Sequence, residues 1–222
     1  MLKATAQFIS VLFHPLLILT YSLVLLLLVN PYIFGVNSIA FQTRLILLIF
    51  LSTFMLPAFS VFMMRNLGLV NSMQLKTKQE RIGPYIITGV FYLWMFVNFK
   101  ENPTIPAAYT IFVLGATIGL FIAFFINIFS KISTHAVGMG GLIGMVIIMM
   151  LQYSYDSFTV NLPIFGSFEM TMNALLMVVI LLAGLVGTAR LILDAHSNKD
   201  LYLGFFVGLF SQFIAMSYMF RN

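Results

Sequence analysis

The residues best suited to chemistry lie near the C-terminus, in a short polar segment (residues 189–200) between two long apolar runs. Arg190, His196 and Asp200 follow the pattern Arg-x5-His-x3-Asp. Ionisable side chains are costly between apolar runs of this length, so they mark a candidate functional site. Phosphoryl transfer is a reaction that such groups can perform, because it requires charge stabilisation, positioning and an activated nucleophile.

Two further polar segments carry residues of the same kinds. Residues 76–84 hold the cations Lys76, Lys78 and Arg81, and residues 131–136 hold Ser133, Thr134 and His135. Ser133 or Thr134 can cap the helix that is predicted to follow, which leaves free N–H groups for an anion beside His135. The plainer interpretation of residues 76–84 is a solvated loop that follows the positive-inside rule.

The composition excludes an ordinary water-soluble domain. Of the 222 residues, 61% are hydrophobic and 8% are charged, and the mean hydropathy is +1.06. Apolar runs near the length that spans a bilayer predict an all-α transmembrane bundle of six to seven spans, forming one domain over residues 1–222. The chain has no cysteine, which excludes disulfides and thiolate metal sites. Its net charge of +5, without a basic run interleaved with aromatic residues, suits anionic lipid head groups and argues against nucleic acid as a partner.

Hydropathy places the spans along the chain. The predicted spans cover residues 8–29, 45–64, 85–99, 107–129, 137–153, 170–193 and 201–220. The run 85–99 is short for a full crossing, so it is either a tilted span or a partly interfacial segment. Residues 30–42, 66–83 and 152–169 are predicted to be loops.

Two features inside the spans are interpreted as structural. His14 lies beside Pro15, which should kink the first span or mark its interfacial end. We therefore interpret His14 as a packed or interfacial side chain. Gly140, Gly141 and Gly144 are predicted to let two membrane helices approach closely, because small residues allow backbones to pack together.

The count of crossings predicts that the three polar segments meet. Two spans precede residues 76–84, two separate them from residues 131–136, two more precede residues 189–200, and one follows. All three segments therefore emerge at one face of the membrane. The alternative is that these segments are simply the loops on the more highly charged side.

The three segments resemble the active-site motifs of the type 2 phosphatidic acid phosphatase superfamily, which includes membrane lipid phosphatases and soluble haloperoxidases. Its motifs are Lys-x6-Arg-Pro, Pro-Ser-Gly-His and Ser-Arg-x5-His-x3-Asp. The third motif matches residues 189–200 except that Ala189 replaces the serine, and the second is represented by Ile-Ser-Thr-His at residues 132–135.

The first motif is the most altered. Arg81 corresponds to its arginine, but Lys76 and Lys78 precede Arg81 by five and three positions, and Pro84 comes three residues after it. The resemblance therefore assigns Arg81 and leaves the lysine open between the two candidates.

This resemblance implies a metal-independent lipid phosphatase without a cofactor. His196 would attack phosphorus and form a phosphohistidine, Asp200 would fix its tautomer, and His135 would protonate the leaving lipid oxygen. The phosphoryl oxygens would be held by basic and hydroxyl side chains. These are Arg190, Arg81, Lys78 or Lys76, Ser133 and Thr134.

Two other functions stay open from the sequence. A divalent metal site is one, although two histidines and one aspartate are a sparse ligand set and the surrounding cations would repel the ion. The second is a non-catalytic protein of the same fold that binds or transports phosphorylated lipids. The substrate is equally open among phosphatidate, phosphatidylglycerol phosphate, polyprenyl diphosphate and a lipid A phosphate.

The predicted location is a bacterial cytoplasmic membrane, as the resemblance to bacterial proteins implies. The face that carries the three segments holds most of the 11 Lys and Arg residues, so the positive-inside rule places it in the cytoplasm. Bacterial relatives with lipid substrates usually face outward, so the side stays open.

Overall fold

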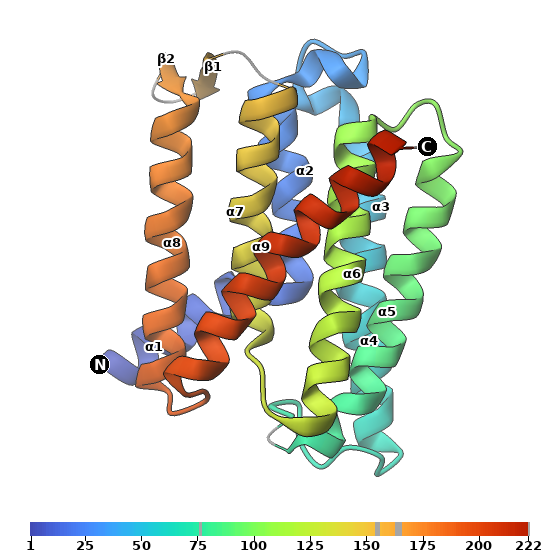
Figure 1. Cartoon of the computed structure of the whole chain (residues 1–222), viewed down its shortest axis with the longest axis vertical. Helices are drawn as coiled ribbons and strands as arrows, with labels where there is room; N and C mark the ends of the chain where they lie inside the picture. Colours follow the sequence, from blue (N-terminus) through green and yellow to red (C-terminus); the bar gives the residue numbers. More distant parts are fainter. Residues whose placement is uncertain (76, 154–155, 163–165, 222) are drawn as a thin grey trace.

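Within the residues that the structure describes, seven helical segments are long and apolar enough to cross a membrane, which confirms the all-α bundle expected from the sequence. The computed structural model of the chain describes residues 1–75, 77–153, 156–162 and 166–221. Five crossings are single helices: α5 (Lys78–Lys100), α6 (Ala107–Phe129), α7 (Thr134–Gln152), α8 (Met172–Ile192) and α9 (Asn198–Arg221). They run up and down the bundle, and α9 crosses the others obliquely (Figure 1).

The first two crossings are composite. The first consists of α1 (Leu2–Leu12), the 3-10 turn η1 (Pro15–Leu17) and α2 (Ile18–Val29). The second consists of the 3-10 turns η2 (Pro31–Phe34) and η3 (Ile39–Gln42), then α3 (Thr43–Phe50), the π-helical η4 (Leu51–Met55) and α4 (Leu56–Asn66). The predicted loop over residues 30–42 therefore contains two short helical turns.

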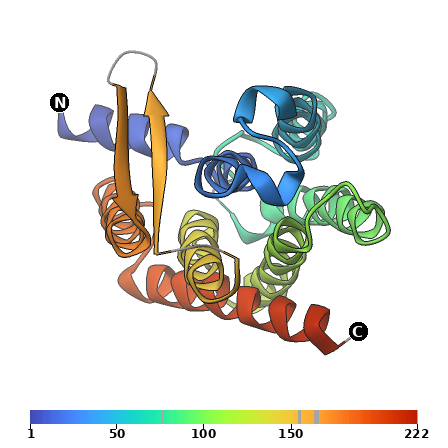
Figure 2. The ribbon, with the colours of Figure 1, turned by 90° about the horizontal axis from the view of Figure 1, so that it is seen from above.

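The predicted kink at His14 and Pro15 is present. Pro15 begins η1, where its missing N–H costs nothing, and His14 Nδ1 accepts a hydrogen bond from Leu16 N at 3.3 Å. Seen from above, α1 lies lengthwise while α2 is seen end-on (Figure 2). The break thus turns α1 across the bundle, where it packs against α8.

Helix α5 begins earlier than expected. Residues 66–83 were predicted to be a loop and 85–99 a short span, whereas α5 covers 23 residues from Lys78. A capping box starts it: Glu80 N donates to Thr77 Oγ1 at 3.3 Å, and Thr77 N donates to Glu80 Oε2 at 3.1 Å. Part of the first polar segment therefore forms the first turns of a full-length crossing.

A β-hairpin replaces part of the predicted loop over residues 152–169. Strand β1 (Ser157–Leu162) pairs antiparallel with β2 (Gly166–Thr171), with Ser157 opposite Thr171. The hairpin lies at the end of the bundle opposite the α8–α9 connection (Figure 1). It packs Phe158 and Met170 against the core, which explains why the chain orders there.

Most of the largest fully buried side chains lie in the half of the bundle nearest this hairpin, in the later turns of α2 and α7 and the first turns of α6. They include Leu23, Leu26, Tyr109, Phe112, Met145 and Ile148. The other half is hollow, as described below.

Helices α7 and α9 cross in near contact of their backbones. A Cβ atom at Gly208 would overlap the carbonyl oxygen of Val137, and one at Gly140 would overlap that of Phe205. This confirms the prediction that the glycines of α7 allow close packing. The crossing also joins two polar segments, because Ser133 N donates to Asp200 O at 3.3 Å.

Replacing Gly208 with alanine is expected to destabilise the protein by about 1–3 kcal/mol, since the new methyl group meets backbone that cannot move aside. Thermal unfolding in detergent measures the effect. Gly184→Ala is the matched control, because, apart from its chain neighbours and its own helix backbone, no atom of the described residues lies within 4 Å of a Cβ built there. Equal melting temperatures for the two variants would contradict the role given to the crossing.

Candidate active site

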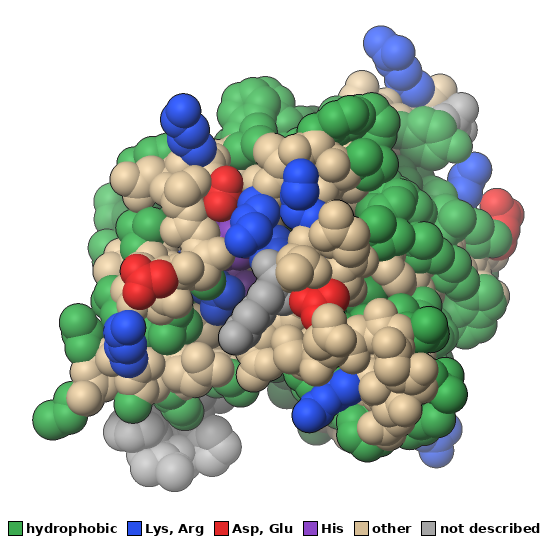
Figure 3. Space-filling view, turned by 90° about the horizontal axis from the view of Figure 1, so that it is seen from below, with side chains coloured by type: hydrophobic (Ala, Val, Ile, Leu, Met, Phe, Trp, Pro, Cys, Tyr) green, Lys and Arg blue, Asp and Glu red, His purple; other side chains and the backbone are tan. Residues whose placement is uncertain are grey.

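The three polar segments meet at one end of the bundle around a cavity of about 900 Å³. The start of α5, the start of α7 and the α8–α9 connection all lie at this end (Figure 1). Seen from below, basic side chains gather around a hollow in which histidine is visible (Figure 3). The crossing count made from hydropathy is therefore correct.

The third segment is shaped by the way α8 ends. Asp194 adopts a left-handed conformation with φ of 51°. Asp194 N donates to Leu191 O at 2.9 Å, and Ala195 N donates to Arg190 O at 3.1 Å. These two bonds form a Schellman motif, which stops the helix. As predicted, the chain turns near residue 194, so His196 lines the same cavity as Arg190.

His196 lies beside a carboxylate that the next helix holds in place. His196 Nδ1 is 3.4 Å from Asp200 Oδ2, with side chains 2% and 18% exposed. The same oxygen accepts a hydrogen bond from Ser197 N at 3.1 Å, while Asp200 N donates to Ser197 Oγ at 3.3 Å. This capping arrangement fixes the carboxylate. The contact with His196 is longer than a hydrogen bond, and such contacts shorten in a substrate complex.

The surroundings of His196 keep its imidazole neutral at pH 7. Burial, assisted by the guanidinium groups of Arg81 and Arg190, lowers its pKa from 6.5 to about 4, although the Asp200 carboxylate acts in the opposite direction. A neutral imidazole whose Nδ1–H faces Asp200 has a lone pair on Nε2. That is the form a nucleophile requires.

A titration of His196 by NMR, with ¹⁵N-labelled histidine in detergent, is expected to give a midpoint near pH 4. Because the unfolded chain binds this proton near pH 6.5, the group's contribution to stability is lost as the pH falls from 6.5 through 4. The His196→Gln variant assigns the resonance. A midpoint at about 6.5, the value of a free histidine, would contradict the burial described here.

His135 occupies the first turn of α7 and is 8% exposed. Its Nε2 lies 3.0 Å from the carbonyl oxygen of Ser10 in α1, so Nε2 carries a proton. Its Nδ1 is buried and has no hydrogen-bond partner among the described residues. His135 lines the cavity, and its free nitrogen is available to exchange a proton with a ligand.

Two arginines reach the cavity in different ways. Arg81 Nε donates to Leu75 O at 2.9 Å and Nη1 donates to Ile132 O at 3.2 Å, which ties the first segment to the second. Arg190 Nε is buried without a hydrogen-bond partner in the described part of the chain, where no acidic side chain is paired with this arginine. Arg190 is therefore a half-buried cation that is not neutralised.

Not every predicted site residue reaches the cavity. Thr134 lines it, whereas Lys78 Nζ donates to Phe129 O at 3.0 Å at the end of α6 and is not among the described lining residues. Ser133 is fully buried and caps α7 through a 3.4 Å bond from Ala136 N. The prediction for Lys76 lies outside the described residues.

Among the described lining residues with basic side chains, two were not predicted to belong to the site. Lys131, the first residue of the second segment, lines the cavity with an exposed side chain. His14 also lines the cavity. The centre of its ring lies 5.8 Å from the centre of the His135 ring, and the planes of the two rings meet at 78°. For Lys131 a sequence signal existed, because it lies two residues before Ser133 and four before His135 of the second segment. No sequence signal placed His14 at the cavity, because only the packing of α1 brings it to that position.

No family model, curated protein or solved structure matches this chain. Membership of the type 2 phosphatidic acid phosphatase superfamily thus stays a prediction from the motif residues.

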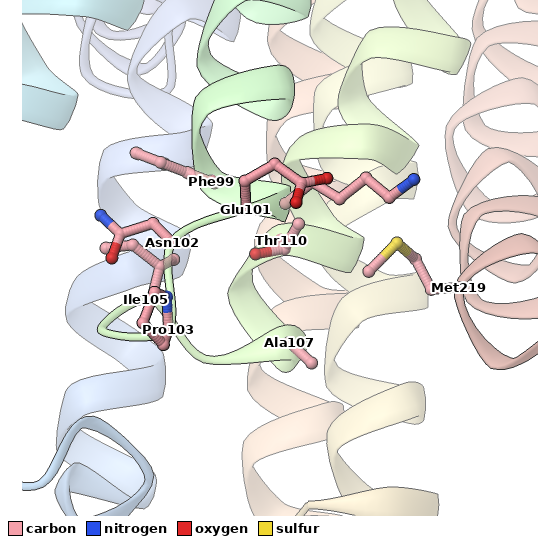
Figure 4. Close-up of a pocket in the computed structure, with 9 residues that line it drawn as sticks. Phe99, Glu101, Asn102, Pro103, Ile105, Ala107, Thr110 and Met219 are labelled. Carbon is pink, nitrogen blue, oxygen red and sulfur yellow. The ribbon is translucent and has the colours of Figure 1, made fainter. Parts of the chain in front are cut away.

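Other sites are less suited to the predicted chemistry. Within the described ranges, no three His, Asp or Glu side chains are close enough to hold a metal ion. A second cavity of about 450 Å³ lies at the opposite end, between the α5–α6 loop and Met219 (Figure 4). It has Lys100 and Glu101 as its charged lining residues, and no histidine is among those described there.

Proposed function

We propose that this chain is an integral membrane lipid phosphatase that hydrolyses a phosphomonoester or diphosphate of a lipid through a phosphohistidine. The observation that carries the proposal is that Arg190, which has no partner among the residues that the structure describes, shares one cavity with His135 and His196. A half-buried guanidinium without a carboxylate is costly unless an anion binds it. A phosphoryl group supplies that anion, and its oxygens match the planar guanidinium.

In the first step, the cations hold the phosphoryl oxygens while His196 Nε2 attacks phosphorus. The P–N bond forms as the bond to the lipid oxygen breaks, and His135 Nδ1 gives its proton to that oxygen. The incoming phosphate favours protonation of His135, because its negative charge offsets the neighbouring guanidinium. Arg190, Arg81 and Lys131 stabilise the charge that spreads over the oxygens.

In the second step, water attacks the phosphohistidine. His135, now without its proton, accepts one from the water as the oxygen bonds to phosphorus. The P–N bond breaks, phosphate leaves, and His196 returns to its neutral form. Asp200 stabilises the imidazole in both steps because its carboxylate faces Nδ1.

The test is phosphate release by the detergent-purified chain from phosphatidate, phosphatidylglycerol phosphate, polyprenyl diphosphate and a lipid A phosphate, with EDTA present. Release that continues in EDTA supports the proposal. Loss of release in EDTA would point to a metal enzyme. Lipid binding without release from any of the four would point to the non-catalytic function.

A further inference from the structure

We infer that the inner end of the cavity, at Gln212, is a second subsite that accepts a hydrogen bond from a donor, such as a hydroxyl, on the apolar chain of the ligand. The inference rests on the proposed function in one respect, namely that the phosphoryl group binds at the charged end. It adds a requirement on the apolar chain of the ligand, which the residues of the three polar segments do not impose.

The cavity is far deeper than a phosphoryl group requires. Arg81 and Tyr92, both on α5, line it at its two ends. They are eleven residues apart, or roughly 16 Å along the helix axis. The inner lining is mostly apolar and includes Phe112 and Met145 at the edge of the packed core. A cavity of this depth and polarity fits a hydrocarbon substituent of the ligand.

Polar side chains interrupt this apolar lining, among them Thr88 and Tyr92 of α5 and Gln212 of α9. Gln212 on α9 lines the cavity, is 3% exposed, and its Oε1 has no hydrogen-bond partner within the described residues. A buried amide oxygen without a partner is costly, and native proteins rarely leave one. An amide oxygen accepts hydrogen bonds, so the missing partner is a donor.

Glycines on two neighbouring helices make room for this amide. A Cβ atom on Gly115 of α6 would overlap Oε1, and one on Gly144 of α7 would lie 3.0 Å from Gln212 Cβ. A Cβ on Gly141 would lie 3.4 Å from Nε2. Gly115 and Gly141 also line the cavity. Oε1 therefore lies directly beside Gly115, a residue of the cavity lining.

The position of the amide sets where the donor lies on the ligand. Gly141 and Gly144 are six and nine residues beyond His135, or roughly 9 and 13 Å along α7. An extended chain advances by about 1.2 Å per bond. The donor is thus about 8 to 11 bonds from phosphorus, whereas a group two carbons from phosphorus is out of reach.

The experiment compares three phosphonates, whose P–C bond keeps them intact, by isothermal titration with the full chain in detergent. The probes are dodecylphosphonate, 8-hydroxydodecylphosphonate, whose hydroxyl is nine bonds from phosphorus, and 2-hydroxydodecylphosphonate. We expect the 8-hydroxy probe to bind about 3- to 10-fold more tightly than the plain probe. The 2-hydroxy probe should show no such gain.

Two variants assign the preference to the amide. Gln212→Leu, similar in size, and Gly115→Ala, which fills the gap beside Oε1, should both bind the plain and 8-hydroxy probes equally. Gly184→Ala should keep the preference. Binding of inorganic phosphate with unchanged affinity shows that each variant is folded.

Equal binding of the plain and 8-hydroxy probes by the unaltered chain would overturn the inference, and so would a preference that persists in Gln212→Leu. Failure of all three probes to bind would overturn it together with the proposed anion site. A preference seen in a protein that releases no phosphate from lipids would uphold the subsite and contradict the proposed enzyme.

Discussion

Alanine in place of His196 is expected to lower kcat for phosphate release by about 10⁴-fold or more, the range found when a covalent nucleophile is removed. The reason is that the variant lacks the nitrogen that bonds to phosphorus, while the cations that hold the substrate remain. Initial rates at saturating lipid measure the effect. Lipid binding should be retained, because His196 is not one of the groups that hold the phosphoryl oxygens.

A second histidine variant separates the nucleophile from the acid. His135→Ala is expected to lose most of its activity on lipids, whose alkoxide is a poor leaving group. With p-nitrophenyl phosphate, whose leaving group needs no proton, this variant should release a burst of p-nitrophenol and then turn over slowly, because the second step still lacks the base that activates water. His196→Ala should give neither a burst nor turnover with either substrate. Comparable activity of His196→Ala and the unaltered chain would rule out the phosphohistidine.

Methionine in place of Arg190 is expected to lower kcat/KM by about 10²- to 10³-fold, because one donor to the transferring group and its charge are lost. Arg190→Lys keeps the charge but loses the forked geometry, so its activity should lie between the two. Arg44→Met is the matched control, since Arg44 is an exposed residue of α3 at the opposite end of the bundle.

Arg190→Met is also expected to change the stability of the protein, in the direction opposite to its effect on activity. Arg190 has no acidic partner in the described part of the chain, so its removal relieves an uncompensated charge. Arg190→Met should therefore melt at the same temperature as the unaltered chain or higher. A lower melting temperature accompanied by the loss of activity would indicate that Arg190 supports the fold instead of a ligand.

Features that depend on local sequence were predicted well. The crossing at residues 107–129 coincides with α6, and the end of α8 lies where the spacing of Arg190 and His196 required it. Hydropathy and motif spacing determine these features directly. The start of α5 was missed although its signal was present, because Thr77 and Glu80 form a capping box that the polarity of the segment concealed.

The composition of the site was less predictable. Whether Lys78 or Lys131 reaches the cavity depends on how α5 and α6 are rotated and where they end. Lys78 begins α5 and bonds to the last turn of α6, while Lys131 lies beyond that turn. The position of His14 depends on α1 packing against α8, more than 150 residues away in the sequence. No local pattern encodes either outcome.

The near contact of α7 and α9 divides the site into a rigid and an adaptable wall. His135 belongs to one helix of this pair and Asp200 to the other, and the backbones leave no space for one helix to slide along its partner. The spacing of His135 and Asp200 is thus set before any ligand binds. Under the proposed function, lipids of different shape would be accommodated on the opposite side of the cavity, where α1 is short, inclined and joined to α2 by a break.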